Sequence, residues 1–256
     1  RISLSFNFWL QPSLPACDHL QKTALITGAS RGIGATTAKT FAAAGWNLQL
    51  MARSEAELET VSQDCRSAEV DVFSACVDLT DPHQVNPGLQ QLIGAGGIPS
   101  VLINNAGAAL TAPLAGTSLE QWQWLLQLNL TSVFQLCNAL LPGLRAQGGG
   151  LIINISSHAA RKTFAGWGAY STTKAALAAF SRCLAEEEGS HGIRVSTLTL
   201  GSVNTPLWDS PTVQAAFDRQ AMLTQEMVAN TLLQMAQTPP QLLLEDLTLM
   251  PASGAF

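Results

Sequence analysis

Short apolar runs alternate with longer segments of helical spacing along most of this chain. The runs cover residues 23–27, 46–52, 71–78, 101–105, 151–156, 194–200 and 244–250. Continuous apolar runs of this length, bounded by glycine or polar residues, are typical of strands that are buried on both faces. We therefore predict about seven strands in one central sheet.

The segments between these runs carry the signals of helices. Residues 33–44 are rich in alanine and end at Gly45, while Ser54 and Asp81 stand where the next two helices begin. Further helices are predicted over residues 119–146, 169–189, 214–220 and 225–237. Regular alternation of strand and helix predicts an α/β fold, a Rossmann-type doubly wound parallel sheet with helices on both faces and right-handed crossovers.

The composition favours a globular protein with a large core. The 256 residues are 47% hydrophobic and 12% charged, with a net charge of −5. Because α/β folds of this length often form one domain, we expect a single domain over residues 22–256. The net negative charge argues against the broad basic surface that nucleic-acid-binding proteins use. No apolar run after residue 21 is long enough to cross a bilayer.

Cysteine and histidine give no sign of a disulfide framework or a metal site. The cysteines are odd in number, widely spaced and free of any CxxC motif, and the histidines lack metal-ligand spacing. These residues are Cys17, Cys65, Cys76, Cys137, Cys183, His19, His83, His158 and His191. The pattern fits a reducing compartment, so we expect a cytoplasmic protein without a metal.

The first 21 residues differ from the rest and form an N-terminal extension. They are apolar but contain two prolines, whereas a signal peptide needs a basic start and a cleaner apolar run. The segment 14–17 (LPAC) has a faint likeness to a bacterial lipoprotein site, which its proline counts against. An export or lipid-anchoring role, a misassigned extension and a short arm packed on another subunit all stay open.

A glycine-rich turn, TGASRGIG, joins the first strand to the first helix. Glycine lets the backbone approach a pyrophosphate closely, and the helix N-terminus supplies N–H groups and a positive pole. The spacing is GxxxGxG, and an ordinary tight turn is the alternative interpretation. The residues expected to bind a dinucleotide here are Gly28, Ser30, Arg31, Gly32, Ile33 and Gly34.

The end of the second strand indicates which dinucleotide binds. An NAD site usually places an acid there to hold the ribose 2′-hydroxyl, but this chain has Arg53 at that point and Arg31 in the glycine turn. Two guanidinium groups that converge suit a 2′-phosphate. We therefore predict NADP(H) as cofactor; the alternative is that both arginines are solvated surface residues.

The single tyrosine of the chain, Tyr170, stands four residues before Lys174 in the segment AYSTTK. Positions four apart share one face of a helix, so the phenol and the ammonium can meet. A nearby cation favours the phenolate, and we expect Lys174 to lower the pKa of Tyr170. The alternative is a buried phenol with one hydrogen bond.

The glycine turn and AYSTTK together make residues 22 to about 250 similar to the short-chain dehydrogenase/reductase family, in its compact, β-ketoacyl reductase-like branch. Further motifs follow in the family's order: an acid after the third strand, NNAG after the fourth, and an asparagine, a serine and YxxxK beyond. The matching residues are Asp78, Leu79, Asn105, Ala106, Gly107, Asn129, Ser157, Tyr170 and Lys174. One departure is Leu200-Gly201 in place of Pro-Gly, although Val203 and Thr205 still follow.

The resemblance implies a role for each matched residue. Tyr170 is expected to be the general acid and base, Ser157 to bind the substrate oxygen, Lys174 to hold the nicotinamide ribose, and Asn129 to hold a proton-relaying water. Asp78 is expected to bind adenine, and Val203 with Thr205 the nicotinamide carboxamide. The hydride is expected from the pro-S face, without a metal.

Three functions are compatible with these residues. The leading prediction is an NADPH-dependent oxidoreductase that reduces a ketone or aldehyde to an alcohol. A β-ketoacyl-acyl-carrier-protein reductase is a second, although the acidic run 186–188 argues for a small free carbonyl compound over an acidic carrier. A non-enzymatic NADP(H) sensor is a third, but such proteins usually lack part of the catalytic set.

The resemblance also implies a homotetramer or homodimer that packs through residues 119–146 and 169–189. Leu125, Leu136, Leu177 and Phe180 suit such an interface, and core packing explains them equally well. His158, Phe164, Trp167 and Trp208 are candidates for the substrate pocket wall; simple packing is the alternative, and none is included among the predicted site residues.

Overall fold

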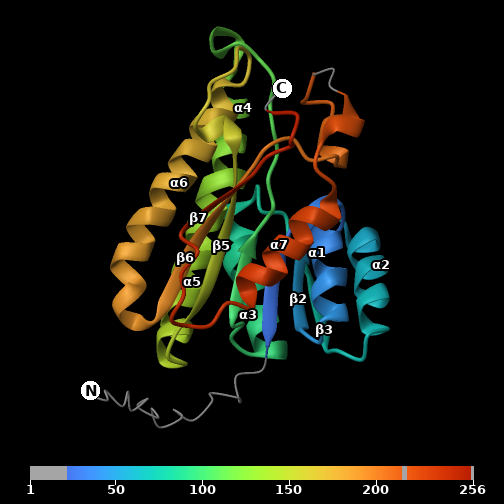
Figure 1. The fold of residues 1–256 in the computed structure, drawn as a ribbon, viewed down its shortest axis with the longest axis vertical. Helices are drawn as coiled ribbons and strands as arrows, with labels where there is room; N and C mark the ends of the chain where they lie inside the picture. The colour runs from blue at the N-terminus through green and yellow to red at the C-terminus, as the bar shows by residue number, and fades with distance from the viewer. Residues whose placement is uncertain (1–21, 215–217, 255–256) are drawn as a thin grey trace, which may run out of the picture.

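The computed structural model describes residues 22–214 and 218–254, and a seven-stranded parallel sheet lies at their centre (Figure 1). The strand order is β3-β2-β1-β4-β5-β6-β7. The strands are β1 (Thr23–Thr27), β2 (Asn47–Ala52), β3 (Val72–Cys76), β4 (Val101–Asn104), β5 (Gly150–Ser157), β6 (Ile193–Leu200) and β7 (Asp246–Leu249). The predicted Rossmann-type α/β fold is confirmed.

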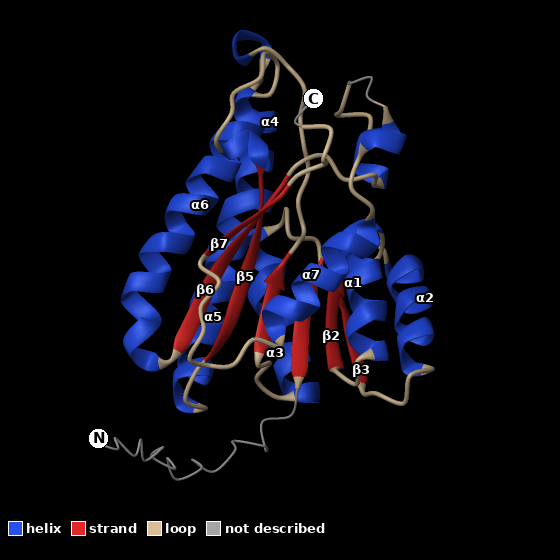
Figure 2. Ribbon diagram, in the orientation of Figure 1, coloured by secondary structure: helices blue, strands red, loops and turns tan. Residues whose placement is uncertain are grey.

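Helices cover both faces of the sheet, as Figure 2 shows. They are α1 (Gly32–Ala43), α2 (Glu55–Arg66), α3 (Pro82–Gly96), α4 (Leu119–Leu126), α5 (Ser132–Ala146), α6 (Gly168–Glu188) and α7 (Gln225–Ala236). Helices α1, α2 and α7 share one buried apolar cluster with the strands, and α3, α5 and α6 share another. The sheet is therefore the middle of three layers.

Strand β1 shows why the apolar runs are continuous. Ala24 and Ile26 belong to the cluster under α1 and α7, whereas Leu25 between them belongs to the cluster under α3 and α5. Successive side chains of a strand point to opposite faces of the sheet. A sheet with helices packed on both faces therefore needs apolar residues at successive positions of its strands. All three side chains are fully buried.

Two helix predictions are corrected by the structure. The expected helix over 119–146 is α4 and α5 joined by a π-helical turn, Gln127–Thr131. The expected helix over 214–220 is wrong where the chain is described: Gln214 is not helical, and Arg219–Ala221 forms a 3₁₀ turn that Asp218 caps by accepting from the Gln220 N–H at 2.9 Å. Residues 215–217 and the N-terminal extension lie outside the described residues.

Most apolar positions proposed for a subunit interface belong to the core of the chain itself. Leu125 and Leu136 are 0% exposed and Leu177 is 1% exposed, so that expectation is wrong for them. Phe180 is partly buried and contacts Phe134, which is 51% exposed on α5. In the part of the chain that is described, no helix has both the length and the apolar character needed to cross a membrane.

The order of the strands sets the place of the site. Strands β2 and β3 extend from one side of β1, and β4 to β7 extend from the other, so the connections leave β1 and β4 in opposite directions. A crevice forms outside the carboxyl ends of strands at such a point. The segments that follow β4 and β6 rise above this same edge (Figure 1).

Candidate active site

The glycine turn is packed so tightly that side chains would not fit in it. Gly28 has φ +65°, and a Cβ there would lie 2.9 Å from the Cα of Ala106. A Cβ on Gly34 would lie 2.2 Å from the carbonyl oxygen of Gly28. The start of α1 is thereby pressed against the turns after β1 and β4.

Hydrogen bonds from Asn105 and Thr27 fix this arrangement. Asn105 Nδ2 donates to the Thr27 carbonyl at 2.8 Å, and the backbone N–H groups of Asn105 and Ala106 donate to Thr27 Oγ1 at 3.1 and 3.0 Å. Sequence reasoning missed Thr27. A hydroxyl at the last position of an otherwise apolar strand is the signal that could have identified it.

A cleft at this edge of the sheet collects most of the predicted cofactor residues. It is lined by Gly28, Ser30, Arg31, Gly32, Ile33, Arg53, Asp78, Leu79, Asn105, Ala106, Gly107 and Thr205, among others. Gly34 lies behind the turn, and Val203, Tyr170 and Lys174 line an adjoining cavity. Helix α1 begins in the cleft without a side-chain cap at Arg31, so its first N–H groups remain available to a phosphate.

Two arginines in the cleft have no partner in the described chain. Arg31 and Arg53 are exposed, and neither makes an ion pair or a side-chain hydrogen bond with the described residues. Other arginines, such as Arg66, Arg145 and Arg219, are bonded to carboxylates. Unpaired guanidinium groups beside a glycine turn and an uncapped helix fit a dinucleotide that carries an extra phosphate.

Asp78 reaches the cleft because β3 ends at Cys76, two residues earlier than predicted. Its Oδ1 accepts from the backbone N–H and the hydroxyl of Thr80 at 2.9 and 2.8 Å. These bonds hold the carboxylate at the rim of the cleft, beside Leu79.

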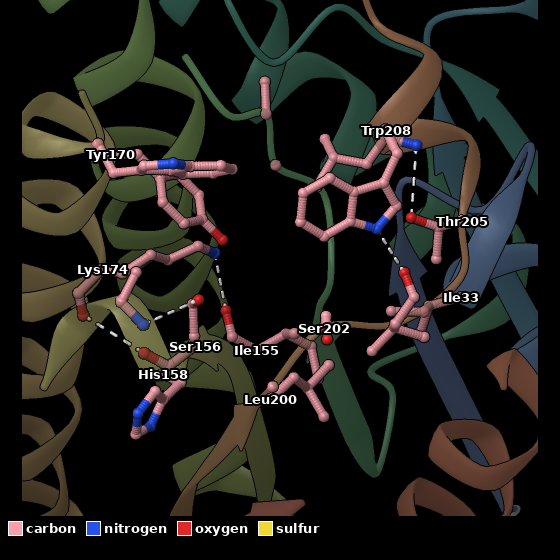
Figure 3. Close-up of a pocket in the computed structure, with 18 of the residues that line it drawn as sticks. Ile33, Ile155, Ser156, His158, Tyr170, Lys174, Leu200, Ser202, Thr205 and Trp208 are labelled. Atoms are coloured by element: carbon pink, nitrogen blue, oxygen red, sulfur yellow. Dashed lines mark hydrogen bonds between the residues drawn. The ribbon is translucent and has the colours of Figure 1, made fainter. Parts of the chain in front are cut away.

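Tyr170 and Lys174 lie together in the adjoining cavity (Figure 3), and Ser157 also lines it. Tyr170 and Lys174 lie one turn apart on α6, and Ser157 is the last residue of β5. The Ser157 side chain hydrogen-bonds the Tyr170 hydroxyl, and Ser157 Oγ accepts from the Ala159 N–H at 3.2 Å. Ser156 points elsewhere: its Oγ donates to the carbonyl of Lys174 at 3.4 Å.

The expected lowering of the Tyr170 pKa is not found. Burial raises the pKa of Tyr170 above its ordinary value, and the hydrogen bond from Ser157 lowers it by less. Lys174 Nζ lies 6.0 Å from the centroid of the phenol ring. Because burial removes the phenol from water, the neutral form is favoured more than the hydrogen bond with Ser157 can offset.

Lys174 is a buried amine with one backbone partner. Its side chain is 6% exposed, and Nζ donates to the carbonyl of Ile155 at 2.8 Å. Burial lowers its pKa to about 8, so the amine still carries its proton at neutral pH. A Cβ on Gly107 would lie 3.6 Å from Nζ, so the glycine of NNAG leaves room beside the ammonium.

Asn129 stands in the π-helical turn and braces the site. Its Oδ1 accepts from the Ala108 N–H, and its Nδ2 donates to the Ala108 carbonyl and to Thr173 Oγ1, at 2.9, 2.9 and 3.0 Å. Thr173 neighbours Lys174 on α6, so Asn129 links the turn after β4 to the helix of Tyr170. This bracing was not predicted, and the expected role of holding a water remains a prediction.

The rest of the cavity lining is largely apolar. Phe164, Trp167 and Trp208 line the cavity, as does His158. Sequence reasoning missed Ser202 and Met250, which also line it. Ser202 Oγ is buried and has no hydrogen-bond partner among the described residues. Ser202 stands directly after Gly201, at the end of the sixth strand, and this position is the signal that could have identified Ser202 from the sequence.

The segments that follow β4 and β6 are joined above the cleft. The Thr111 N–H donates to the Thr212 carbonyl at 2.9 Å, and Thr212 Oγ1 donates to the Ala109 carbonyl at 2.7 Å. Arg219 binds Asp209 and donates to the Thr205 carbonyl at 2.9 Å. These bonds tie Thr212 to the segment after β4, and they tie Arg219 to the residues that follow β6.

Comparison with known proteins matches this architecture. A family model described as short chain dehydrogenase matches residues 22–215. The chain is 32% identical to an L-xylulose reductase of Bos taurus over 204 residues, 77% of this chain and 80% of that protein. It is also 32% identical to the 3-oxoacyl-[acyl-carrier-protein] reductase FabG of Chlamydia muridarum over 189 residues, 73% of this chain and 76% of that protein.

A solved structure shares both the fold and part of the sequence. The L-sorbose reductase of Gluconobacter frateurii, crystallised with NADPH and L-sorbose, superposes with a TM-score of 0.82 at 28% identity. The match covers 90% of this chain and 95% of that one. The similarity thus extends over the glycine turn, the cleft and the cavity.

Proposed function

This chain belongs to the short-chain dehydrogenase family, and on that premise we propose that it is an NADP(H)-dependent oxidoreductase that reduces a ketone or aldehyde to an alcohol. The observation that carries the proposal is the meeting of Tyr170, Ser157 and Lys174 in a cavity that adjoins the glycine-lined cleft. A proton donor, a hydrogen-bond donor and a cation then face the same space.

Each of these side chains has one task in the proposed reaction. A bound reduced nicotinamide supplies the hydride that reaches the carbonyl carbon. Tyr170 donates its hydroxyl proton to the carbonyl oxygen as negative charge develops there. Ser157 Oγ accepts from the Ala159 N–H, and its own proton, which bonds the Tyr170 hydroxyl in the absence of substrate, would be donated to the same carbonyl oxygen once substrate binds. Lys174 faces this space as an ammonium and stabilises the phenolate that remains.

The raised pKa of Tyr170 supports reduction as the favoured direction near neutral pH. A phenol in water has a pKa of about 10, and burial raises that of Tyr170 further. The hydroxyl therefore keeps the proton that reduction consumes. Oxidation of an alcohol needs the phenolate, which is the scarce form under the same conditions.

We predict opposite pH responses for the two directions. The kcat for reduction stays level through neutral pH, whereas the kcat for alcohol oxidation rises as pH increases into the alkaline range. Ser157→Ala removes the hydrogen bond that lowers the Tyr170 pKa, so its oxidation profile should move to higher pH. Profiles of both directions for the wild type and the variant check this; an oxidation rate that falls from neutral to alkaline pH contradicts it.

The choice of NADP(H) over NAD(H) rests on Arg31 and Arg53. Both lie in the cleft without partners among the described residues, and the residue directly after β2 is Arg53 and not an acid. The related L-sorbose reductase was crystallised with NADPH, which supports the same choice.

Arg53→Ala tests this choice. A hydrogen bond to a charged group is worth about 1.5–3 kcal/mol, so the KM for NADPH should rise about 10- to 100-fold while that for NADH changes little. Arg66→Ala, at the exposed end of α2, is the matched control and should leave both constants unchanged. Equal losses for the two cofactors with Arg53→Ala would refute a 2′-phosphate contact.

The assay for the proposed function is oxidation of NADPH with a panel of carbonyl compounds. Turnover with simple ketones or aldehydes supports it and excludes a purely sensory role. The similarity to FabG favours a β-ketoacyl thioester as a second candidate substrate, so the panel includes one. Absence of turnover with every carbonyl would refute the proposal.

We also propose a homotetramer or homodimer in the cytoplasm. Phe134, exposed beside Phe180 on the outer side of α5 and α6, supports an interface there. The cytoplasmic location rests on the spacing of the cysteines, of which Cys65, Cys76, Cys137 and Cys183 are free. Light scattering of the purified protein measures the mass of the assembly.

A further inference from the structure

The cavity in front of Tyr170 has two chemically different sides. Figure 3 shows Tyr170 and Lys174 on one side of an open space and Trp208 on the other, with Leu200 and Ser202 between them. The side of Trp208 also carries Leu207, and Phe164, Trp167 and Met250 line the same cavity. A substrate whose carbonyl reaches Tyr170 must therefore place its remaining atoms against apolar side chains.

The aromatic wall is held in a fixed orientation. Trp208 Nε1 donates to the carbonyl of Val203 at 2.7 Å, which anchors the indole to the end of β6. The Trp167 ring packs edge-on against both neighbours, with centroids 6.0 Å from Trp208 and 5.7 Å from Tyr170. Aromatic rings prefer offset or edge-to-face contacts at such distances, so a flat ring is the group this wall accepts best.

The described lining of the cavity offers little charge to an anionic substrate, and Lys162, whose Nζ lies 5.4 Å from the ring centroid of Phe164, is not part of that lining. Among its described lining residues the one lysine or arginine is Lys174, whose ammonium is bonded to Ile155, and there is no aspartate or glutamate. His158 also lines the cavity, but Figure 3 shows its ring directed away from Trp208. A carboxylate or phosphate placed against Trp208 would lose its hydration without gaining a counter-charge.

Few polar atoms of the cavity remain available to substrate hydroxyls. Asn105 is bonded to Thr27, and Ser156 is bonded to Lys174. Ser157 and Tyr170 are required at the reacting oxygen, which leaves Ser202 Oγ as the buried hydroxyl without a partner. A ketose carries a hydroxyl on nearly every carbon, and most of these would be buried unpaired.

From these contacts we infer that the substrate is an uncharged ketone or aldehyde bearing an aromatic ring, which packs on the wall formed by Trp167 and Trp208 while its carbonyl faces Tyr170 and Ser157. The inference rests on the proposed carbonyl reduction and assigns its substrate class. The names of two relatives give L-xylulose and L-sorbose as their substrates. The substrate class that we infer for this chain is different, because the apolar side of this cavity faces the part of the substrate beyond the carbonyl.

The test compares four carbonyl compounds in the NADPH oxidation assay: acetophenone, its 4-carboxylate, 2-butanone and L-sorbose. We expect kcat/KM for acetophenone to exceed that for the carboxylate by about 100-fold or more, because a buried unpaired charge is costly. L-Sorbose should be the poorest neutral substrate. The carboxylate or L-sorbose performing as well as acetophenone would overturn the inference while leaving carbonyl reduction standing.

The Trp208→Leu variant tests whether the aromatic wall contributes to substrate preference, as distinct from a general loss of turnover. It should lower kcat/KM for acetophenone by about tenfold, the value of a lost aromatic contact, while 2-butanone, which has no ring, changes by less than about threefold. Trp208→Phe should retain most of the preference. Met227→Leu, an exposed apolar change on α7, is the remote control. Equal losses for both ketones in Trp208→Leu would overturn the role of the wall, and no turnover with any of the four compounds would refute carbonyl reduction itself.

Discussion

Tyr170→Phe is expected to lower kcat/KM for carbonyl reduction by about 10²- to 10⁴-fold, the usual contribution of a positioned general acid. The substitution removes one hydroxyl and keeps the ring, which packs edge-on against Trp167. The wall of the cavity and the start of α6 therefore remain as they are. Since the cleft is lined by other residues, the Kd for NADPH should stay within about twofold of the wild-type value.

Two measurements on this variant distinguish chemistry from structure. Cofactor fluorescence gives the Kd for NADPH, and turnover of a good ketone gives kcat/KM. Retained binding with lost turnover is the predicted pair. Turnover at the wild-type level would show that the proton comes from another group, and loss of NADPH binding would show that the hydroxyl had a mainly structural role.

Gly34→Ala is expected to destabilise the protein by about 3 kcal/mol and to weaken NADPH binding by about 100-fold. The new Cβ would lie 2.2 Å from the Gly28 carbonyl oxygen and 2.7 Å from Asn105 Nδ2, and neither group can move without disturbing its neighbours. Asn105 holds the turn through its bond to Thr27. The clash exceeds the gain of about 1 kcal/mol that alanine normally brings to a helix.

Gly94→Ala is the matched control for this change. Gly94 also lies in a helix, α3, but a Cβ there meets nothing within 4 Å. The substitution should raise stability by about 0.5–1 kcal/mol and leave NADPH binding unchanged. Thermal unfolding and cofactor titration of both variants check the pair. Equal behaviour of Gly34→Ala and Gly94→Ala would contradict the close approach inferred for the glycine turn.

Features that depend on neighbours in sequence could be predicted without the structure. Tyr170 and Lys174 are one helical turn apart, and the glycine turn follows the first strand directly, so local geometry brings each set together. The parallel sheet follows from apolar runs that have no polar side. These features locate the cleft and most of its lining.

Contacts between distant segments could not be predicted in this way. Asn129 bonds to Thr173, and Thr111 bonds to Thr212, across 44 and 101 positions of sequence. No local pattern links such pairs, because the fold alone brings them together. The same holds for Leu125 and Leu177: helical spacing marks an apolar face, but only the packed structure shows that the chain covers it itself.

The direction of the Tyr170 pKa shift was also beyond the sequence. Spacing indicates that a cation lies near the phenol, which favours the phenolate. Whether the phenol is also removed from water depends on the residues that surround it in space. Here burial is the larger effect, and the pKa is raised.

The central claim is that a carbonyl compound bound in the cavity at Tyr170 receives a hydride at its carbonyl carbon from a reduced nicotinamide. The most direct test uses NADPH labelled with deuterium at both positions of C4, the wild-type protein and a ketone that supports turnover, with mass spectrometry of the alcohol. We predict one deuterium on the carbinol carbon of the product. An alcohol without deuterium, formed while the labelled NADPH is consumed, would contradict this account.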